Sequence, residues 1–143
     1  MALEIRPFSE TDAQAVAALW KQVFSDAPAW NIPEADIDRK LQVQPELFLV
    51  AILEGKIVGT AMAGFDGHRG WVYYLAVSPG HRRQGIGTEL MRRVEEDLAA
   101  MGCPKLNLQV RASNAQAGSF YQRLGYRVEE RISMGKRLQL DDT

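Results

Sequence analysis

Arg82-Arg83-Gln84-Gly85-Ile86-Gly87-Thr88 is a basic, glycine-containing segment that lies between an apolar stretch typical of a strand and a long amphipathic helical pattern. Backbone N–H groups at the start of a helix point outward without partners, and the helix dipole makes that end weakly positive. Glycine lets the backbone approach an anion closely, and the two arginines add charged donors. The segment therefore predicts a cradle for a pyrophosphate.

This motif alone has low specificity. It lacks the Gly-Lys-Ser/Thr of a Walker motif, and Leu90 stands where a dinucleotide fingerprint has its third glycine. An ordinary strand-to-helix turn with solvated arginines explains the segment about equally well. The choice between the two interpretations depends on the sequence that follows the helix.

A second motif follows a predicted strand at residues 106–110. It reads Asn114-Ala115-Gln116-Ala117-Gly118-Ser119-Phe120-Tyr121-Gln122-Arg123-Leu124-Gly125-Tyr126. Arg-x-x-Gly-x-Gly before a helix, followed by Asn-x-x-Ala-x-x-x-Tyr-x-x-x-Gly-Tyr, resembles the GNAT superfamily of acetyl-CoA-dependent N-acetyltransferases. The resemblance extends from residue 71 to about residue 126, and it covers the first half of the chain only in the order of elements.

The resemblance implies an α/β (α+β) fold built on one mixed, mostly antiparallel sheet. About seven strands and about four flanking helices are expected, with two parallel strands that splay apart. Hydrophobic periodicity predicts strands at residues 3–8, 47–53, 56–64, 71–77, 106–110, 126–132 and 134–138. It predicts helices that follow a capping box at residues 9–12 and that span residues 34–41, 85–101 and 114–124.

Composition is compatible with such an enzyme. The 143 residues, 46% of them hydrophobic, suit a single domain over residues 1–143. A net charge of −1 argues against nucleic acid or a membrane surface as a partner. The lone Cys103 forms no intrachain disulfide, and no signal-peptide or membrane-spanning pattern is present. We expect a cytoplasmic protein, and the sequence leaves open whether it forms a homodimer.

By resemblance, acetyl-CoA is the co-substrate. Main-chain groups around Leu75, Ala76 and Val77 are expected to bond the pantetheine amides and the thioester carbonyl. The pyrophosphate is expected at Arg82, Arg83, Gln84, Gly85, Ile86, Gly87 and Thr88. Asn114 has two competing interpretations, a cofactor contact and the N-cap of the last helix.

Tyr121 is the predicted catalytic side chain. Acyl transfer from a thioester expels a thiolate, and a phenol of pKa about 10 can protonate it. A tyrosine that simply packs one turn from Leu124 is the alternative, and its register with Asn114 and Gly125 favours the catalytic role.

The general base is not identified. Residues 108–114 resemble the ribosomal-protein N-terminal acetyltransferases, in which a Glu on this strand is the base, but Gln109 stands at that position. An amide cannot accept the proton, so Tyr73, Tyr74, Asp66 and His68 stay open as candidates. The turn at residues 65–70 and the late Gly-Lys-Arg-Leu at residues 135–138 look more like a small bacterial GNAT subgroup.

Two further features concern the ligands. Trp30 and Asn31 lie in the segment that walls the acceptor site in families of this kind, although Trp30 could equally anchor that loop to the core. His68 and His81 have no partners at metal-ligand spacing, so no metal is predicted.

These observations predict an N-acetyltransferase in which an acceptor amine attacks acetyl-CoA directly, without a covalent enzyme intermediate. The acceptor is a small molecule or a protein amine, so protein N-terminal or lysine acetylation is the alternative within the enzyme class. A non-catalytic CoA-binding sensor is the alternative outside it, which the absence of a base at Gln109 favours and the presence of Tyr121 disfavours.

Overall fold

The computed structural model describes residues 2–139. The chain divides into two compact units, Met1–Leu108 and Gln109–Thr143. The first unit contains a sheet with helices α1 to α3, and the second contains helix α4. The residues that were predicted to bind the pantetheine and pyrophosphate all belong to the first unit, whereas Asn114 and Tyr121 belong to the second.

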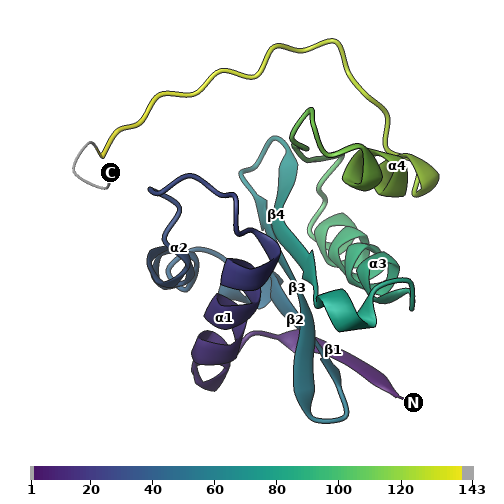
Figure 1. Cartoon of the computed structure of the whole chain (residues 1–143). Helices are drawn as coiled ribbons and strands as arrows, with labels where there is room; N and C mark the ends of the chain where they lie inside the picture. The colour runs from purple at the N-terminus through teal and green to yellow at the C-terminus, as the bar shows by residue number, and fades with distance from the viewer. Residues whose placement is uncertain (1, 140–143) are drawn as a thin grey trace. The chain divides into compact units, whose positions relative to one another are not determined.

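A mixed sheet with the strand order β1-β2-β3-β4-β5 forms the centre of the first unit (Figure 1). Its strands are β1 Leu3–Pro7, β2 Phe48–Leu53, β3 Lys56–Phe65, β4 Gly70–Val77 and β5 Leu106–Asn107. Neighbouring strands pair antiparallel except for β4 and β5, which pair in parallel. The β2–β3 hairpin turns at Glu54 and Gly55, both of which have positive φ as a tight two-residue hairpin requires.

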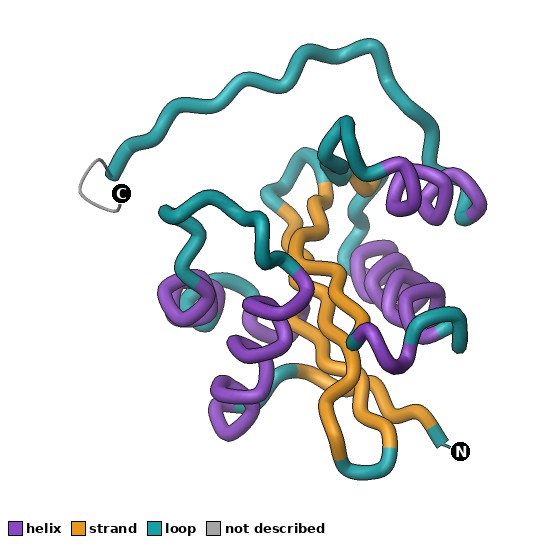
Figure 2. The backbone as a smooth tube through the Cα atoms, viewed as in Figure 1, coloured by secondary structure: helices purple, strands orange, loops and turns teal. Residues whose placement is uncertain are grey.

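Helices cover both faces of this sheet (Figures 1 and 2). Helices α1 (Ala13–Val23) and α2 (Pro33–Lys40) lie on one face, and α3 (Ile86–Ala100) lies on the other. Helix α1 follows the predicted capping box, in which the backbone N–H of Ser9 donates to the Asp12 carboxylate at 2.8 Å. Pro33 occupies the first turn of α2, where its missing N–H has no cost.

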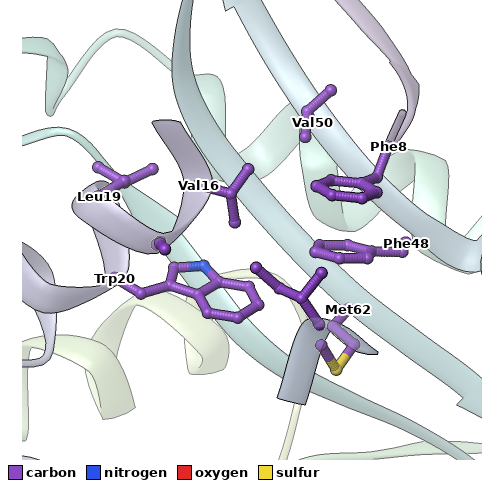
Figure 3. Close-up of a cluster of buried hydrophobic side chains, with 10 residues drawn as sticks. Phe8, Val16, Leu19, Trp20, Phe48, Val50 and Met62 are labelled. Atoms are coloured by element: carbon purple, nitrogen blue, oxygen red, sulfur yellow. The ribbon is translucent and has the colours of Figure 1, made fainter. Parts of the chain in front are cut away.

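Aromatic rings fill the core between α1 and the sheet (Figure 3). Phe8 stacks on Phe48 with ring centroids 4.5 Å apart, and Trp20 stacks on Phe48 at 5.7 Å. Trp20 projects from α1, and it is 1% exposed. This burial attaches α1 firmly to β2 and β3.

A buried hydroxyl connects the core to β4. The Trp20 indole Nε1 donates to Thr60 Oγ1 at 2.8 Å, and Thr60 Oγ1 donates to the Tyr74 carbonyl at 2.8 Å. Thr60 pairs with Ala76 and Met62 pairs with Tyr73, so β4 contains one more residue than β3 between these pairs. The strand therefore bulges around Tyr74, whose φ of +52° is in the left-handed region.

Three predictions about the strands differ from the structure. The described residues of 126–138 contain no strand, so the sheet has five strands within residues 2–139 instead of about seven. The strand predicted at residues 106–110 is the two-residue β5. Val128, Ile132, Met134 and Leu138 are 85–89% exposed. Alternating apolar residues predicted strands there, but a strand also needs a neighbouring strand and a buried face.

Removal of the buried hydroxyl should destabilise the fold. Thr60→Val keeps the shape of the side chain but leaves the Trp20 N–H and the Tyr74 carbonyl without their partner. We expect a loss of about 2 kcal/mol in the free energy of unfolding, measured by urea denaturation. Thr11→Val, at an exposed position before α1, is the matched control. Equal stability of the two variants would contradict a structural role for the Thr60 hydroxyl.

Candidate functional site

The predicted pyrophosphate cradle is a continuous loop and helix start. After β4 the chain makes the 3-10 turn Pro79–His81, and Arg82, Arg83, Gln84 and Gly85 follow as exposed residues before α3 begins at Ile86. Arg83 and Gly85 have φ values of +65° and +81°. A backbone that alternates in this way turns its N–H groups toward one side and forms an anion-binding concavity.

The first turn of α3 adds donors to this concavity. The first helical hydrogen bond runs from the Glu89 N–H to the Gly85 carbonyl at 3.0 Å. The N–H groups of Ile86, Gly87 and Thr88 precede that bond, so the helix itself supplies them with no acceptor. A Cβ built on Gly85 meets no heavy atom within 4 Å, which shows that the space above the loop is open. Open N–H groups, a helix N-terminus and two exposed arginines fit the pyrophosphate of acetyl-CoA.

Gly59 holds this helix start against the sheet. A Cβ at this glycine would lie 3.0 Å from Leu90 Cδ1, 3.1 Å from Ile86 Cγ2 and 3.1 Å from the Ala76 carbonyl oxygen. A larger residue would have to displace Leu90, Ile86 or the Ala76 carbonyl, so this glycine supports the close approach of α3 to the sheet. The sequence analysis missed this residue, although a glycine in the interior of a strand is a signal of close packing.

The second half of β4 has an open edge. Strand β5 pairs only with Gly70 and Trp71, so within the described residues no strand pairs with residues 72–77 on that side. Leu75, Ala76 and Val77 lie in this stretch, directly after the bulge residue Tyr74. The Ala76 side chain is 1% exposed and points into the core. Main-chain groups are therefore what this edge offers to a ligand, and the contact with pantetheine stays a prediction.

The second unit holds the two remaining predicted residues. Asn114 is the N-cap of α4 (Ala115–Arg123), because its Oδ1 accepts the Ala117 N–H at 3.1 Å. Tyr121 lies on α4, where its ring packs edge-on against Phe120 and Tyr126. Burial raises the pKa of Tyr121 to about 12, so the phenol keeps its proton at neutral pH.

The candidate bases differ in their surroundings. Gln109, which the sequence analysis excluded as a base, donates to the Ser133 hydroxyl. Asp66 accepts the N–H groups of His68 and Arg69 at 2.8 Å each, which lower its pKa and give it the role of a turn-forming residue.

Tyr74 differs from these candidates because its hydroxyl meets a carboxylate. It donates to Asp36 Oδ2 at 2.5 Å. The sequence analysis missed Asp36, since 38 residues separate it from Tyr74 and no local pattern joins them.

A cavity of about 400 Å³ lies between α1, α2 and the loop that joins them. Asn31 lines it, as does Tyr74, whereas Trp30 is 38% exposed and is not one of the lining residues in the described chain. Of the described residues, no three His, Cys, Asp or Glu side chains form a group suited to a metal ion. None of the helices in residues 2–139 combines the length and the apolar composition needed to cross a membrane.

Comparisons with known proteins place the chain among acetyltransferases. The sequence is 48% identical over 139 residues to an acetyltransferase of Yersinia enterocolitica, covering 97% of this chain and 98% of that protein. It is 48% identical over 136 residues to an acetyltransferase of Pectobacterium atrosepticum, with coverage of 95% and 96%.

Solved structures share the fold. An aminoglycoside N-acetyltransferase in complex with CoA matches with a TM-score of 0.79 at 21% identity, covering 96% of both chains. The ribosomal-protein-S18-alanine N-acetyltransferase from Escherichia coli matches with a TM-score of 0.73 at 27% identity, covering 87% of this chain and 77% of that one.

The family match includes parts of both compact units. The sequence model of the Acetyltransferase (GNAT) family matches residues 13–126, from the start of α1 to the residue after Gly125. This range contains the β4 bulge, the cradle and the Asn114 to Tyr126 motif. The chain therefore belongs to the Acetyltransferase (GNAT) family.

Proposed function

We propose that this enzyme transfers an acetyl group from acetyl-CoA to an amine by direct attack, without a covalent intermediate on the protein. The observation that carries the proposal is the continuity of the cradle with the open edge of β4. Strand β4 ends at Val77, and the short turn Pro79–His81 leads directly into the cradle. One segment can thus hold both the pyrophosphate and the pantetheine of the same molecule.

Cys103 is a poor candidate for a covalent nucleophile. The Cys103 thiol donates to the Lys105 carbonyl at 3.4 Å, and a Cβ at Gly70 would lie only 2.9 Å from its sulfur. This cysteine is part of the packing below α3, where a thiol acts as a small apolar group. Direct attack by the amine is the simpler mechanism.

In the proposed reaction, Tyr121 donates its proton to the sulfur as the C–S bond breaks. Its raised pKa keeps the phenol protonated, so Tyr121 can donate a hydrogen bond to the sulfur as negative charge develops there, and the proton completes its transfer as the thiol forms. A sensor that only binds CoA needs no such donor. We propose on this basis that residues 1–143 form one catalytic domain, and that Asn114 contributes to it by capping α4.

The acceptor is an amine of a small molecule or of a protein. An aminoglycoside acetyltransferase from a soil metagenome and the ribosomal-protein acetyltransferase are 28% and 27% identical to this chain, so similarity alone favours neither class. The ribosomal-protein class places a Glu where this chain has Gln109. That difference supports a small-molecule acceptor. A single cysteine bonded to a backbone carbonyl supports a reducing, cytoplasmic location.

The cradle can be tested by a single substitution. Gly87→Val places a branched side chain in the first turn of α3, where the proposed phosphate must approach the backbone. We expect CoA to bind at least tenfold more weakly, which corresponds to about 1.4 kcal/mol, as measured by calorimetry. Gly135→Val, where a Cβ has open space, is the control. Unchanged CoA affinity in folded Gly87→Val protein would refute the cradle.

Tyr121→Phe tests the proton donor. The substitution keeps the ring and removes the hydroxyl, so CoA affinity should persist while the chemical step slows by a factor of roughly 10². Single-turnover acetyl transfer is the measurement, because slow product release can hide the effect in steady state. Tyr126→Phe removes the hydroxyl from the ring that packs against Tyr121 and should behave as wild type. A wild-type single-turnover rate in Tyr121→Phe would make Tyr121 a packing residue.

A further inference from the structure

The first unit contains a cavity of about 400 Å³. Its lining comes from α1, α2, the loop that joins them and Tyr74 of β4, and both helices lie on one face of the sheet (Figure 2). Its volume is at the lower end of the range that suits small-molecule ligands. Half of the lining residues are large apolar or aromatic residues or prolines, namely Trp20, Phe24, Pro28, Ile32, Pro33 and Tyr74.

Tyr74 lines this cavity and is packed on both α1 and α2. Its ring stacks on Trp20 with centroids 3.7 Å apart and planes 7° from parallel, and Phe24 packs edge-on at 5.5 Å. Its hydroxyl donates to Asp36 Oδ2 at 2.5 Å, while Asp36 Oδ1 accepts from Arg39 at 2.7 Å. Burial and the bond to Asp36 raise the pKa of Tyr74. A phenol that donates a hydrogen bond to a carboxylate becomes a stronger acceptor for a second hydrogen bond.

The same residue also shapes the open edge of β4. Tyr74 is the bulge residue, with φ of +52°, a conformation that is costly for a bulky side chain. Such strain persists where surrounding contacts hold it, and it is frequent at functional sites. The backbone of this residue adjoins Leu75 on the edge proposed for acetyl-CoA, and its side chain lines the cavity. The residue therefore joins the proposed thioester position to the cavity.

The charges around the cavity indicate what it can hold. Lys21 and Glu34 line it and form an ion pair at 2.7 Å, with more than half of each side chain exposed. Asp36 and Arg39 form the second pair, behind Tyr74. Both cations are thus paired. Apart from the uncharged polar residues Ser25 and Asn31, the remaining wall is aromatic and apolar. Aromatic faces attract a ligand cation, whereas a polycation would need several acidic groups.

We propose that, in the acetyltransferase proposed above, this cavity binds a primary amine with a compact apolar body, and that Tyr74 and Asp36 together remove its proton. The inference rests on the proposed function because it assigns the acceptor and the base of that same reaction. Tyr74 is the catalytic residue, since it touches the substrate. Asp36 acts through Tyr74 and is a positioning residue that also receives the phenolic proton.

The proposed step is balanced in protons and electrons. The neutral amine nitrogen uses its lone pair to bond the thioester carbonyl carbon, and the electrons of the C–S bond leave with sulfur. One N–H proton passes to Tyr74 Oη as the phenolic proton passes to Asp36 Oδ2. Tyr121 gives a proton to sulfur and regains one from solvent, and Asp36 releases the proton it received to solvent. The products are the N-acetyl amine and the free thiol.

The first test identifies the acceptor class. Wild-type protein and acetyl-CoA are incubated with phenethylamine, spermidine, kanamycin or a peptide with a free N-terminus, and thiol release is followed. We expect phenethylamine to react at least tenfold faster than the others. Reaction of another amine without phenethylamine would overturn the assignment of the cavity and leave the proposed acetyltransferase function intact.

Calorimetry measures binding of the amine separately from acetyl transfer. Phenethylamine is titrated into the complex of the protein with CoA, and we expect Ile32→Arg to weaken its binding at least tenfold by placing a cation in the wall. Phenethylamine that binds in this way without thiol release would contradict the proposed acetyl transfer and retain the amine site. Absence of both binding and reaction would overturn the inference.

The last test concerns the proton. Tyr74→Phe and Asp36→Asn should each lower kcat for phenethylamine by a factor of roughly 10² with CoA affinity unchanged. Asp38→Asn, an exposed acid on the same helix, is the matched control and should keep the wild-type kcat. If Asp36 accepts the proton, sodium formate should restore activity to Asp36→Ala and not to Tyr74→Phe. If Asp36 has only a structural role, an added base will not restore the activity of Asp36→Ala. Full kcat in Asp36→Asn, or equal formate effects on both variants, would overturn the proton-removing role.

Discussion

The Thr60 hydroxyl is the contact on which the arrangement of the first unit depends. It accepts the Trp20 indole N–H from α1 and donates to the Tyr74 carbonyl of β4. Thr60 is fully buried, where a polar group without a hydrogen-bond partner is costly. Moving α1 or β4 away from Thr60 would leave the indole N–H, the hydroxyl or the carbonyl without its partner. The hydrogen bonds therefore connect α1 to the sheet and stabilise the bulge of β4 at Tyr74.

Because of the bulge, β4 contributes both to the open edge of the sheet and to the sheet face that carries α1 and α2. Beyond it, Leu75 to Val77 form an edge on which main-chain groups are available, because β5 pairs only with the start of β4. The Tyr74 side chain lies against Trp20 and Phe24 on the face of α1 and α2. On the opposite face, Gly59 lets α3 approach the sheet and so sets the position of the cradle. The proposed donor and acceptor sites thus share one strand.

This division separates general from specific recognition. The cradle and the β4 edge offer backbone groups and arginines, which in the proposed enzyme bind features that every CoA thioester has. Most of the cavity wall comes from side chains of α1, the following loop and α2, whereas Trp20 and Tyr74 also belong to the contacts that hold the bulge of β4. In the proposed enzyme, the choice of the amine therefore depends mainly on the loop between α1 and α2 and on the start of α2.

Much of the fold was predictable because it follows from local patterns. The capping box at Ser9, the hairpin at Glu54 and Gly55, and the start of α3 after Gly85 all depend on backbone preferences within a few residues. The final two strands were not predictable in this way. Alternating apolar residues describe what a strand could bury, and a strand forms only where a neighbouring strand accepts its hydrogen bonds.

The sequence by itself determined the family, predicted the cradle and offered the capping of α4 as one of two roles for Asn114, since each rests on a motif of nearby residues whose geometry is set by the local backbone. Only the tertiary structure decided the bulge, the close approach at Gly59 and the contact between Tyr74 and Asp36. These features join residues that are far apart in the chain. Their geometry comes from the packing of whole elements against each other, and no local pattern contains it.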